Sequence, residues 1–136
     1  MTRLLPALVI LALLPAACGS GRPSESDLKD SFVEQLIANS FVREVQRDGD
    51  TITFSAPTAA GPAGSWRVTV DSAVIEPQDT AATPFKGTVT SSWYENGTLV
   101  ESKGRESQLP LELTSNGLAQ ECWALWSGAA SRWEWE

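Results

Sequence analysis

The chain has 136 residues, with 10 Lys and Arg, 17 Asp and Glu and no His, so its formal net charge is −7. An acidic surface repels phosphate backbones, so we expect no nucleic-acid partner. The absence of His excludes a Ser-His-Asp catalytic triad and most zinc sites. The length suits a single domain with one hydrophobic core.

The first residues have the composition of an export signal. Arg3 precedes an apolar stretch over residues 4–14, and the segment closes on the small residues Ala16 and Ala17 before Cys18. An apolar run of ~7–15 residues is typical of a signal peptide and is too short to span a bilayer.

The Ala16-Ala17-Cys18 run resembles the lipobox of bacterial lipoprotein precursors, in which two small residues precede a Cys that is acylated and becomes the new N-terminus. Pro15 stands where this family usually has Leu. The resemblance implies a signal peptide over residues 1–17, a lipidated Cys18 and a lipid-anchored protein of the cell envelope. Gly19 follows the Cys where the family has Asp for inner-membrane retention. In a cell with two membranes, this implies the periplasmic face of the outer membrane.

Ordinary secretion with cleavage after Gly19 is the alternative, and it would also remove Cys18. In both cases Cys122, the second of the two cysteines, has no intramolecular partner. We therefore expect Cys122 to be a buried, unpaired thiol with a structural role. Glu121 beside it would raise its pKa, which argues against a nucleophile.

Residues 18–26 are predicted to form the lipidated Cys and a flexible tether, and residues 27–136 a single α+β domain. Gly and Ser dominate the tether, and a coil of this length has an end-to-end distance of roughly 15 Å. A helix is predicted over residues 27–39, with Ser24 or Ser26 as its cap. Its apolar residues recur at helical spacing: Leu28, Phe32, Val33, Leu36 and Ile37.

After the helix the apolar pattern changes to a period of two, which predicts strands joined by X-Gly turns. The predicted strands cover residues 41–47, 50–56, 66–75, 85–95, 98–107, 109–115, 118–126 and 132–136. The predicted hairpin turns are Asp48-Gly49, Asn96-Gly97 and Asn116-Gly117.

Registers and loops follow from these turns. Arg47 is expected opposite Asp50, and Tyr94 opposite Leu99. In the strand over residues 66–75, one face is expected to carry Trp66, Val68, Val70 and Val74. Loops are predicted over residues 57–64 and 77–84.

The predicted fold class is α+β, with one N-terminal helix packed on a curled antiparallel β-meander. In outline this element order resembles the small cystatin-like and NTF2-like domains. That resemblance implies a scaffold and no particular activity.

Tryptophan is the other unusual feature, because four of the six Trp lie close to the C-terminus. These four residues are Trp123, Trp126, Trp133 and Trp135. Trp133 and Trp135 share one face of the last strand, so they either close the core or belong to a ligand-binding or partner-binding surface.

The sequence favours a non-enzymatic envelope lipoprotein that acts as a binding or accessory module for another envelope protein. One alternative is a carrier that holds an apolar or lipid ligand in the concave face of the sheet. A second is a small hydrolase that uses paired carboxylates, since glycosidases need no His. We predict no catalytic, metal-binding or cofactor-binding residue and no cofactor.

Overall fold

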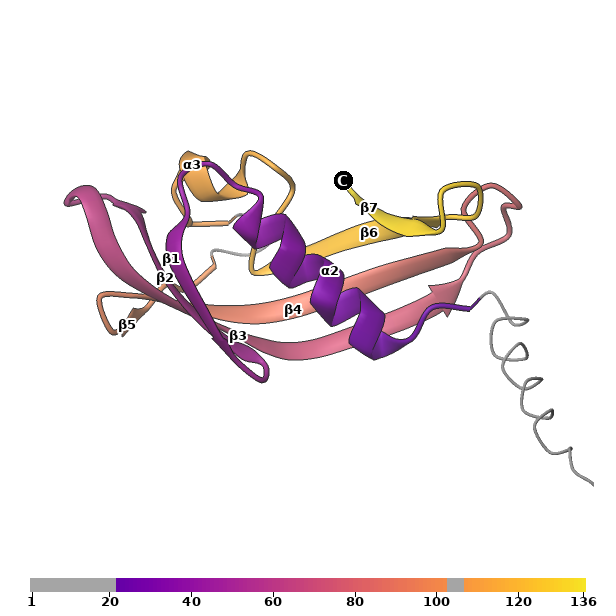
Figure 1. The fold of residues 1–136 in the computed structure, drawn as a ribbon, viewed down its shortest axis with the longest axis horizontal. Helices are drawn as coiled ribbons and strands as arrows, with labels where there is room; N and C mark the ends of the chain where they lie inside the picture. The colour runs from indigo at the N-terminus through magenta and orange to yellow at the C-terminus, as the bar shows by residue number, and fades with distance from the viewer. Residues whose placement is uncertain (1–21, 103–106) are drawn as a thin grey trace, which may run out of the picture.

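The computed structural model describes residues 22–102 and 107–136, so Cys18 and the predicted signal peptide lie outside the described residues. Helix α2 (Glu25–Ile37) comes first and a short helix α3 (Leu111–Thr114) lies between strands β5 and β6 (Figure 1). The strands are β1 (Arg43–Asp48), β2 (Thr51–Thr58), β3 (Gly61–Pro77), β4 (Phe85–Glu95), β5 (Thr98–Leu99), β6 (Glu121–Ser127) and β7 (Arg132–Trp135).

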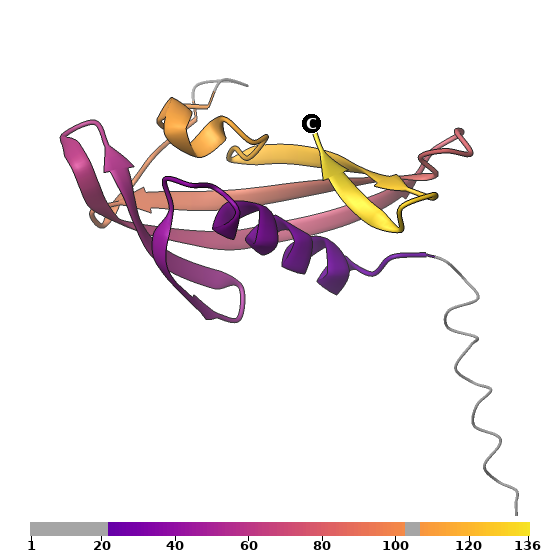
Figure 2. The same ribbon diagram turned by 45° about the horizontal axis from the view of Figure 1, so that its top comes forward.

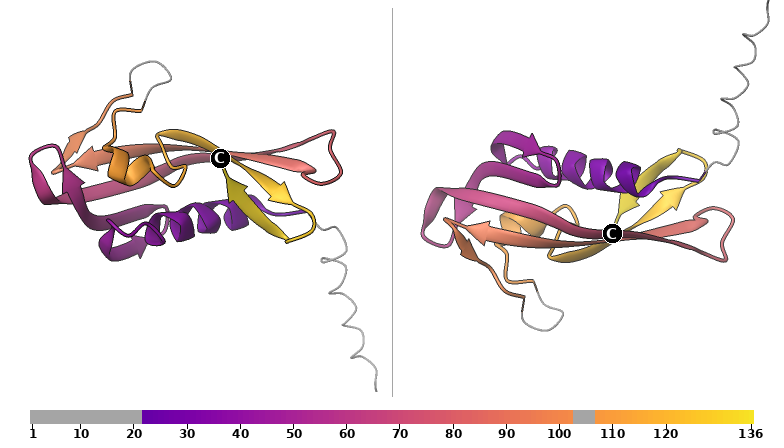
Figure 3. Two further views of the ribbon diagram at one scale, coloured as in Figure 1. Left: turned by 90° about the horizontal axis from the view of Figure 1, so that it is seen from above. Right: turned by 90° about the horizontal axis from the view of Figure 1, so that it is seen from below.

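The strands form one antiparallel sheet in the order β1-β2-β3-β4-β6-β7. β5 and β6 share one edge of β4, because β5 pairs with its last residues and β6 with its first six. The sheet curls, and α2 lies along one of its two faces (Figures 2 and 3). The predicted α+β class is confirmed, although the sheet dominates and the helix spans Glu25–Ile37 instead of the predicted residues 27–39.

Helix α2 starts with a capping box, which identifies Ser24 as the cap. The Ser24 hydroxyl accepts from the Asp27 amide at 3.0 Å, and the Asp27 carboxylate accepts from the Ser24 amide at 3.0 Å. Leu28, Phe32 and Leu36 are fully buried against the sheet, as their spacing predicts. Burial of this apolar stripe is what holds the helix on the sheet.

The turn of the first hairpin lies one residue later than predicted, which shifts the strand pairing by two residues. Arg47 pairs with Ile52 rather than with Asp50, so the loop is Gly49-Asp50. Two ion pairs to α2 accompany this register, Lys29–Asp50 at 3.1 Å and Arg47–Asp30 at 2.9 Å. Gly49 supplies the left-handed conformation that the turn requires (φ 63°).

A β-bulge in β3 overturns the predicted placement of Val74. The pairing with β4 shifts between Val70 and Ser72, which leaves Asp71 as the extra residue. Such a bulge reverses the faces of the residues that follow it. Ala73 is therefore buried, whereas Val74 is 48% exposed on the opposite face from Val70.

The third predicted hairpin is wrong, because residues 109–115 do not form a strand. Pro110 precedes the short helix α3, and Gly117 closes its C-terminal turn with φ 96°. Leu113 of α3 is fully buried, next to the buried Leu109 and Leu118 in the same core. The apolar residues that suggested a strand thus pack as a one-turn helix.

Strand boundaries also differ from the prediction. The second predicted hairpin keeps its Tyr94–Leu99 pair, but β5 ends at Leu99 instead of continuing to residue 107. The predicted loop over residues 57–64 is shorter, since β2 runs to Thr58 and β3 starts at Gly61. A Pro- and Gly-rich run is thus held within the β2–β3 ladder.

Candidate functional site

The described chain is packed against the domain from its first residues. The Arg22 guanidinium carbon lies 5.0 Å from the centre of the Phe85 ring, and Pro23 is buried. Residues 22–26 therefore belong to the folded domain, where the sequence suggested that the tether continues. Phe85 is the first residue of β4, so the chain enters the domain beside the β3–β4 loop (Figure 1).

The four C-terminal Trp residues divide between the two faces of the sheet. Trp133 is 7% exposed, and its ring centre lies 5.4 Å from that of Trp126. Trp135 is partly buried, lies 5.9 Å from the Phe32 ring and donates from Nε1 to the Ser31 hydroxyl at 3.0 Å. These three rings face the core.

Trp123 faces away from the core. It is 40% exposed, and the Lys86 ammonium lies 4.8 Å from its ring centre. A single exposed ring with one cation on it is a small contact surface. The structure does not bring Trp123 together with the other three Trp residues.

A second aromatic cluster lies toward the other end of the sheet and was not anticipated as a unit. Phe54 and Trp66 are stacked at 6.2 Å, and Trp93 meets both rings edge-on at 6.1 and 6.2 Å. The cluster is buried. Because side chains alternate between the two faces of a strand, the sequence assigned each of these rings to one face of its own strand. Only the strand registers show that the three rings meet.

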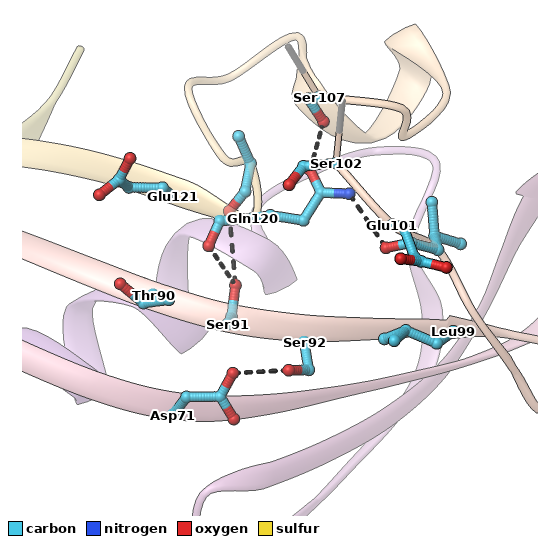
Figure 4. Close-up of a pocket in the computed structure, with 12 residues that line it drawn as sticks. Asp71, Thr90, Ser91, Ser92, Leu99, Glu101, Ser102, Ser107, Gln120 and Glu121 are labelled. Carbon is cyan, nitrogen blue, oxygen red and sulfur yellow. Dashed lines mark hydrogen bonds between the residues drawn. The ribbon is translucent and has the colours of Figure 1, made fainter. Parts of the chain in front are cut away.

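An open pocket of about 490 Å³ lies where β5 leaves the edge of β4 and β6 joins it (Figure 4). Hydroxyl and carboxylate side chains line most of its wall: Asp71, Thr90, Ser91, Ser92, Glu101, Ser102, Ser107 and Glu121. Ser107 donates to the Gln120 side-chain oxygen at 2.7 Å, and Ser92 donates to Asp71 at 2.5 Å. The pocket thus offers a polar surface for hydrogen bonding.

The carboxylates of this pocket lie at its solvent-facing wall. Asp71, Glu101 and Glu121 are all exposed. Sequence reasoning did not find this pocket, because the β3 bulge and the gap between β5 and β6 create it. No motif in the sequence marks either feature.

Cys122 has the environment of a structural thiol. It is 4% exposed, in the middle of β6, and has no disulfide partner among the described residues. Its pKa is raised from 9.0 to about 11, chiefly by burial and also by the Glu121 charge, against the lowering effect of a hydrogen bond with the Ala119 backbone. The thiol is therefore protonated at neutral pH and is a poor nucleophile.

We expect Cys122 to react slowly with a thiol reagent in the native protein and rapidly after unfolding. Fast labelling of the native state would contradict this prediction.

The raised pKa of Cys122 also makes the stability of the protein depend on pH, because the folded state holds the thiol proton more tightly than the unfolded chain. This contribution is complete below pH 9 and is lost as the pH rises from 9.0 to about 11. Denaturation of wild type and Cys122→Ala across this range measures it, since the variant lacks this term. The same pH dependence in wild type and variant would contradict this contribution.

Three exposed apolar residues lie on segments that meet at the α3 end of the molecule. They are Ile37 (52% exposed), Phe41 (46%) and Leu111 (82%). The buried Asn39 ties their segments together, donating to the Glu112 carbonyl at 2.7 Å and accepting from the Phe41 amide at 2.8 Å. These three residues are called the distal patch below, because α3 lies at the opposite end from Arg22 (Figure 1).

Within residues 22–102 and 107–136, no group of three or more His, Cys, Asp or Glu side chains is placed to hold a metal ion. In the same part of the chain, none of the helices has the length and apolar character needed to cross a bilayer.

Comparison of the chain with protein-family models, with curated proteins and with solved structures finds no match.

Proposed function

We propose that the protein is a lipid-anchored lipoprotein of the bacterial cell envelope that acts, without catalysis, as a binding or accessory module for another envelope component. The observation that carries this proposal is the position of Cys18 in its lipobox-like run, four residues before the first described residue, Arg22. Removal of residues 1–17 would leave α2 as the first element of the mature chain. In a cell with two membranes, the periplasmic face of the outer membrane is the proposed location.

The distal patch supports a binding role. Three large apolar side chains are exposed on adjoining segments whose backbone is fixed by Asn39. Exposed apolar residues that gather on a rigid surface are typical of protein–protein contact sites. The patch lies at the end of the domain away from the anchor, where a partner has access to it.

The two alternatives receive less support. A carrier needs an apolar space beneath the concave face, but side chains of α2 fill that side and Leu28, Phe32 and Leu36 are 0% exposed. A hydrolase needs a carboxylic acid held protonated near neutral pH, and the pocket carboxylates Asp71, Glu101 and Glu121 are exposed to solvent.

Membrane fractionation of Cys18→Ser tests the anchor. We expect wild type to incorporate labelled fatty acid and to stay with the membranes, because several acyl chains together give stable attachment. The variant should incorporate no label and leave the membrane fraction. Identical fractionation of the two proteins, or no acylation of wild type, would refute lipidation.

The distal patch is tested with a photo-crosslinking residue at position 41 in cells. We expect a discrete adduct, and we expect Leu111→Asp to abolish it, because a buried charge disfavours an apolar contact. Position 74 provides a matched control, since Val74 is similarly exposed (48%, against 46% for Phe41) but lies on the uncovered sheet face. Equal crosslinking from both positions would contradict a specific partner surface.

A further inference from the structure

Two hairpin loops form the end of the sheet beside the chain's entry point. They are the β3–β4 loop (residues 78–84) and the β6–β7 loop (residues 128–131), and the Gly128 amide donates to the Ala82 carbonyl at 3.0 Å. The two loops are called the tether-end tip below. Figures 1 and 3 show them together at the end where the described chain begins.

The tether-end tip differs in composition from the rest of the acidic chain. Its residues are Gln, Asp, Thr, Ala, Pro, Gly and Ser, and Asp79 alone is charged. Both cations and carboxylates border the tip: Arg22 lies over Phe85, Lys86 pairs in register with Glu76, and Arg132 forms an ion pair with Glu134 at 3.6 Å. A surface of small residues with a single carboxylate meets anionic headgroups with less repulsion than a carboxylate-rich surface.

Chain length limits how far this tip can lie from the anchor. Three residues, Gly19 to Gly21, separate Cys18 from Arg22, and four fully extended residue steps span at most ~14 Å. β3 contains 17 residues, and a strand of that length extends about 50 Å. A lipid on Cys18 therefore holds the tether-end tip close to the bilayer. The length of β3, which separates the tip from the other end of the sheet, is several times the reach of this tether.

The faces of the sheet are less suited to lie on the membrane. The uncovered face exposes Asp71, Glu76 and Glu121 beside Arg67, and the helix face exposes Asp30 and Glu34. Glu25 and Asp27 lie on the first turn of α2. A molecule that lies flat on either face would bring several carboxylates to the headgroups, whereas the tip carries one.

We propose that the tether-end tip rests on the phospholipid headgroups and that the sheet projects from the membrane, with the distal patch turned away from it. This orientation rests on the proposed lipidation of Cys18. It assigns the bilayer surface as the partner of the two loops and leaves the distal patch accessible to a second protein.

The orientation is measured with two matched variants that each add one exposed cysteine, Ala129→Cys in the tip and Ala60→Cys in the β2–β3 turn at the other end. Both alanines are exposed, and Cys122 is buried and protonated. The acylated proteins are purified from membranes, labelled with a fluorophore and reconstituted in phosphatidylethanolamine and phosphatidylglycerol vesicles that carry headgroup nitroxides. We expect the label at position 129 to lose most of its fluorescence and the label at position 60 to keep it.

Sedimentation with the vesicles separates the two proposals. Failure of the labelled proteins to sediment would refute the lipid anchor and the orientation with it. Sedimentation with equal quenching at both positions, or stronger quenching at position 60, would refute the orientation and leave the anchor intact.

A charge variant provides a second measurement. Ala81→Glu adds a carboxylate to the tip, and Ala60→Glu adds the same charge to the opposite end. With the label at position 129, we expect Ala81→Glu to reduce quenching and Ala60→Glu to leave it unchanged. Equal effects of the two substitutions would contradict contact between the tip and the headgroups.

Discussion

Replacement of Trp133 by Ala is expected to lower the free energy of unfolding by ~3–5 kcal/mol, because it removes a large buried side chain and leaves a cavity. Trp133 is 7% exposed and packs on Trp126, and a Cβ at Gly87 would meet it at 3.0 Å. Its Nε1 has no hydrogen-bond partner among the described residues. Both Ala and Phe remove this unpaired donor, but Phe still fills part of the cavity, so Trp133→Phe should be milder than Trp133→Ala.

Trp123→Ala is the matched control, because Trp123 is 40% exposed and faces away from the core. We expect it to change stability much less than Trp133→Ala.

Deletion of residues 132–136 removes Trp133, Trp135 and the hydrogen bonds between β6 and β7. A domain has only ~5–15 kcal/mol of stability to lose, so the truncated protein should be unfolded or degraded. Chemical denaturation measures these differences. Wild-type stability of Trp133→Ala would mean that the ring does not close the core.

Local patterns in the sequence predicted the elements that depend on neighbouring residues. The four-residue spacing of Leu28, Phe32 and Leu36 predicted α2 and its buried face. The Asn96-Gly97 turn set the register of Tyr94 with Leu99. In both cases the physical cause, helical periodicity or a turn that needs positive φ, is contained in a short segment.

The remaining differences arise from contacts between distant segments. Nothing near Asp71 marks a bulge, and the switch from Val74 to Ala73 on the buried face follows from pairing with β4. The apolar residues around Leu113 fit a strand as well as a helix, and burial beside Leu109 and Leu118 decides between them. Short apolar runs carry this ambiguity in general.

The candidate surfaces were even less predictable. The distal patch joins residues 37, 41 and 111, and Asn39 links them through a bond to the Glu112 carbonyl that spans 73 positions. The C-terminal Trp residues were a visible feature, but the sequence left open whether they form core or surface. The structure places three of them on the core side and Trp123 on the other. Only Cys18 was identified from a local motif, and it lies outside the described residues.

Trp93→Ala is expected to destabilise the opposite end of the domain by ~3–5 kcal/mol, since the side chain is fully buried and large. Trp93 is 0% exposed and contacts both Phe54 and Trp66 edge-on. Its Nε1 donates to the buried Ser91 hydroxyl at 2.8 Å. Trp93→Phe keeps part of the ring packing and loses this bond, which is worth ~1 kcal/mol, so its effect should be smaller.

Tyr94 is the natural comparison, because it is the next residue of β4 and points to the uncovered face, where its ring centre lies 4.2 Å from the Arg67 guanidinium carbon. Tyr94→Ala removes a smaller aromatic ring from a partly exposed site, so we expect a clearly smaller loss than for Trp93→Ala. Urea denaturation of the three variants gives the order. If Tyr94→Ala cost as much as Trp93→Ala, the cluster of Phe54, Trp66 and Trp93 would not be the main source of stability at this end of the sheet.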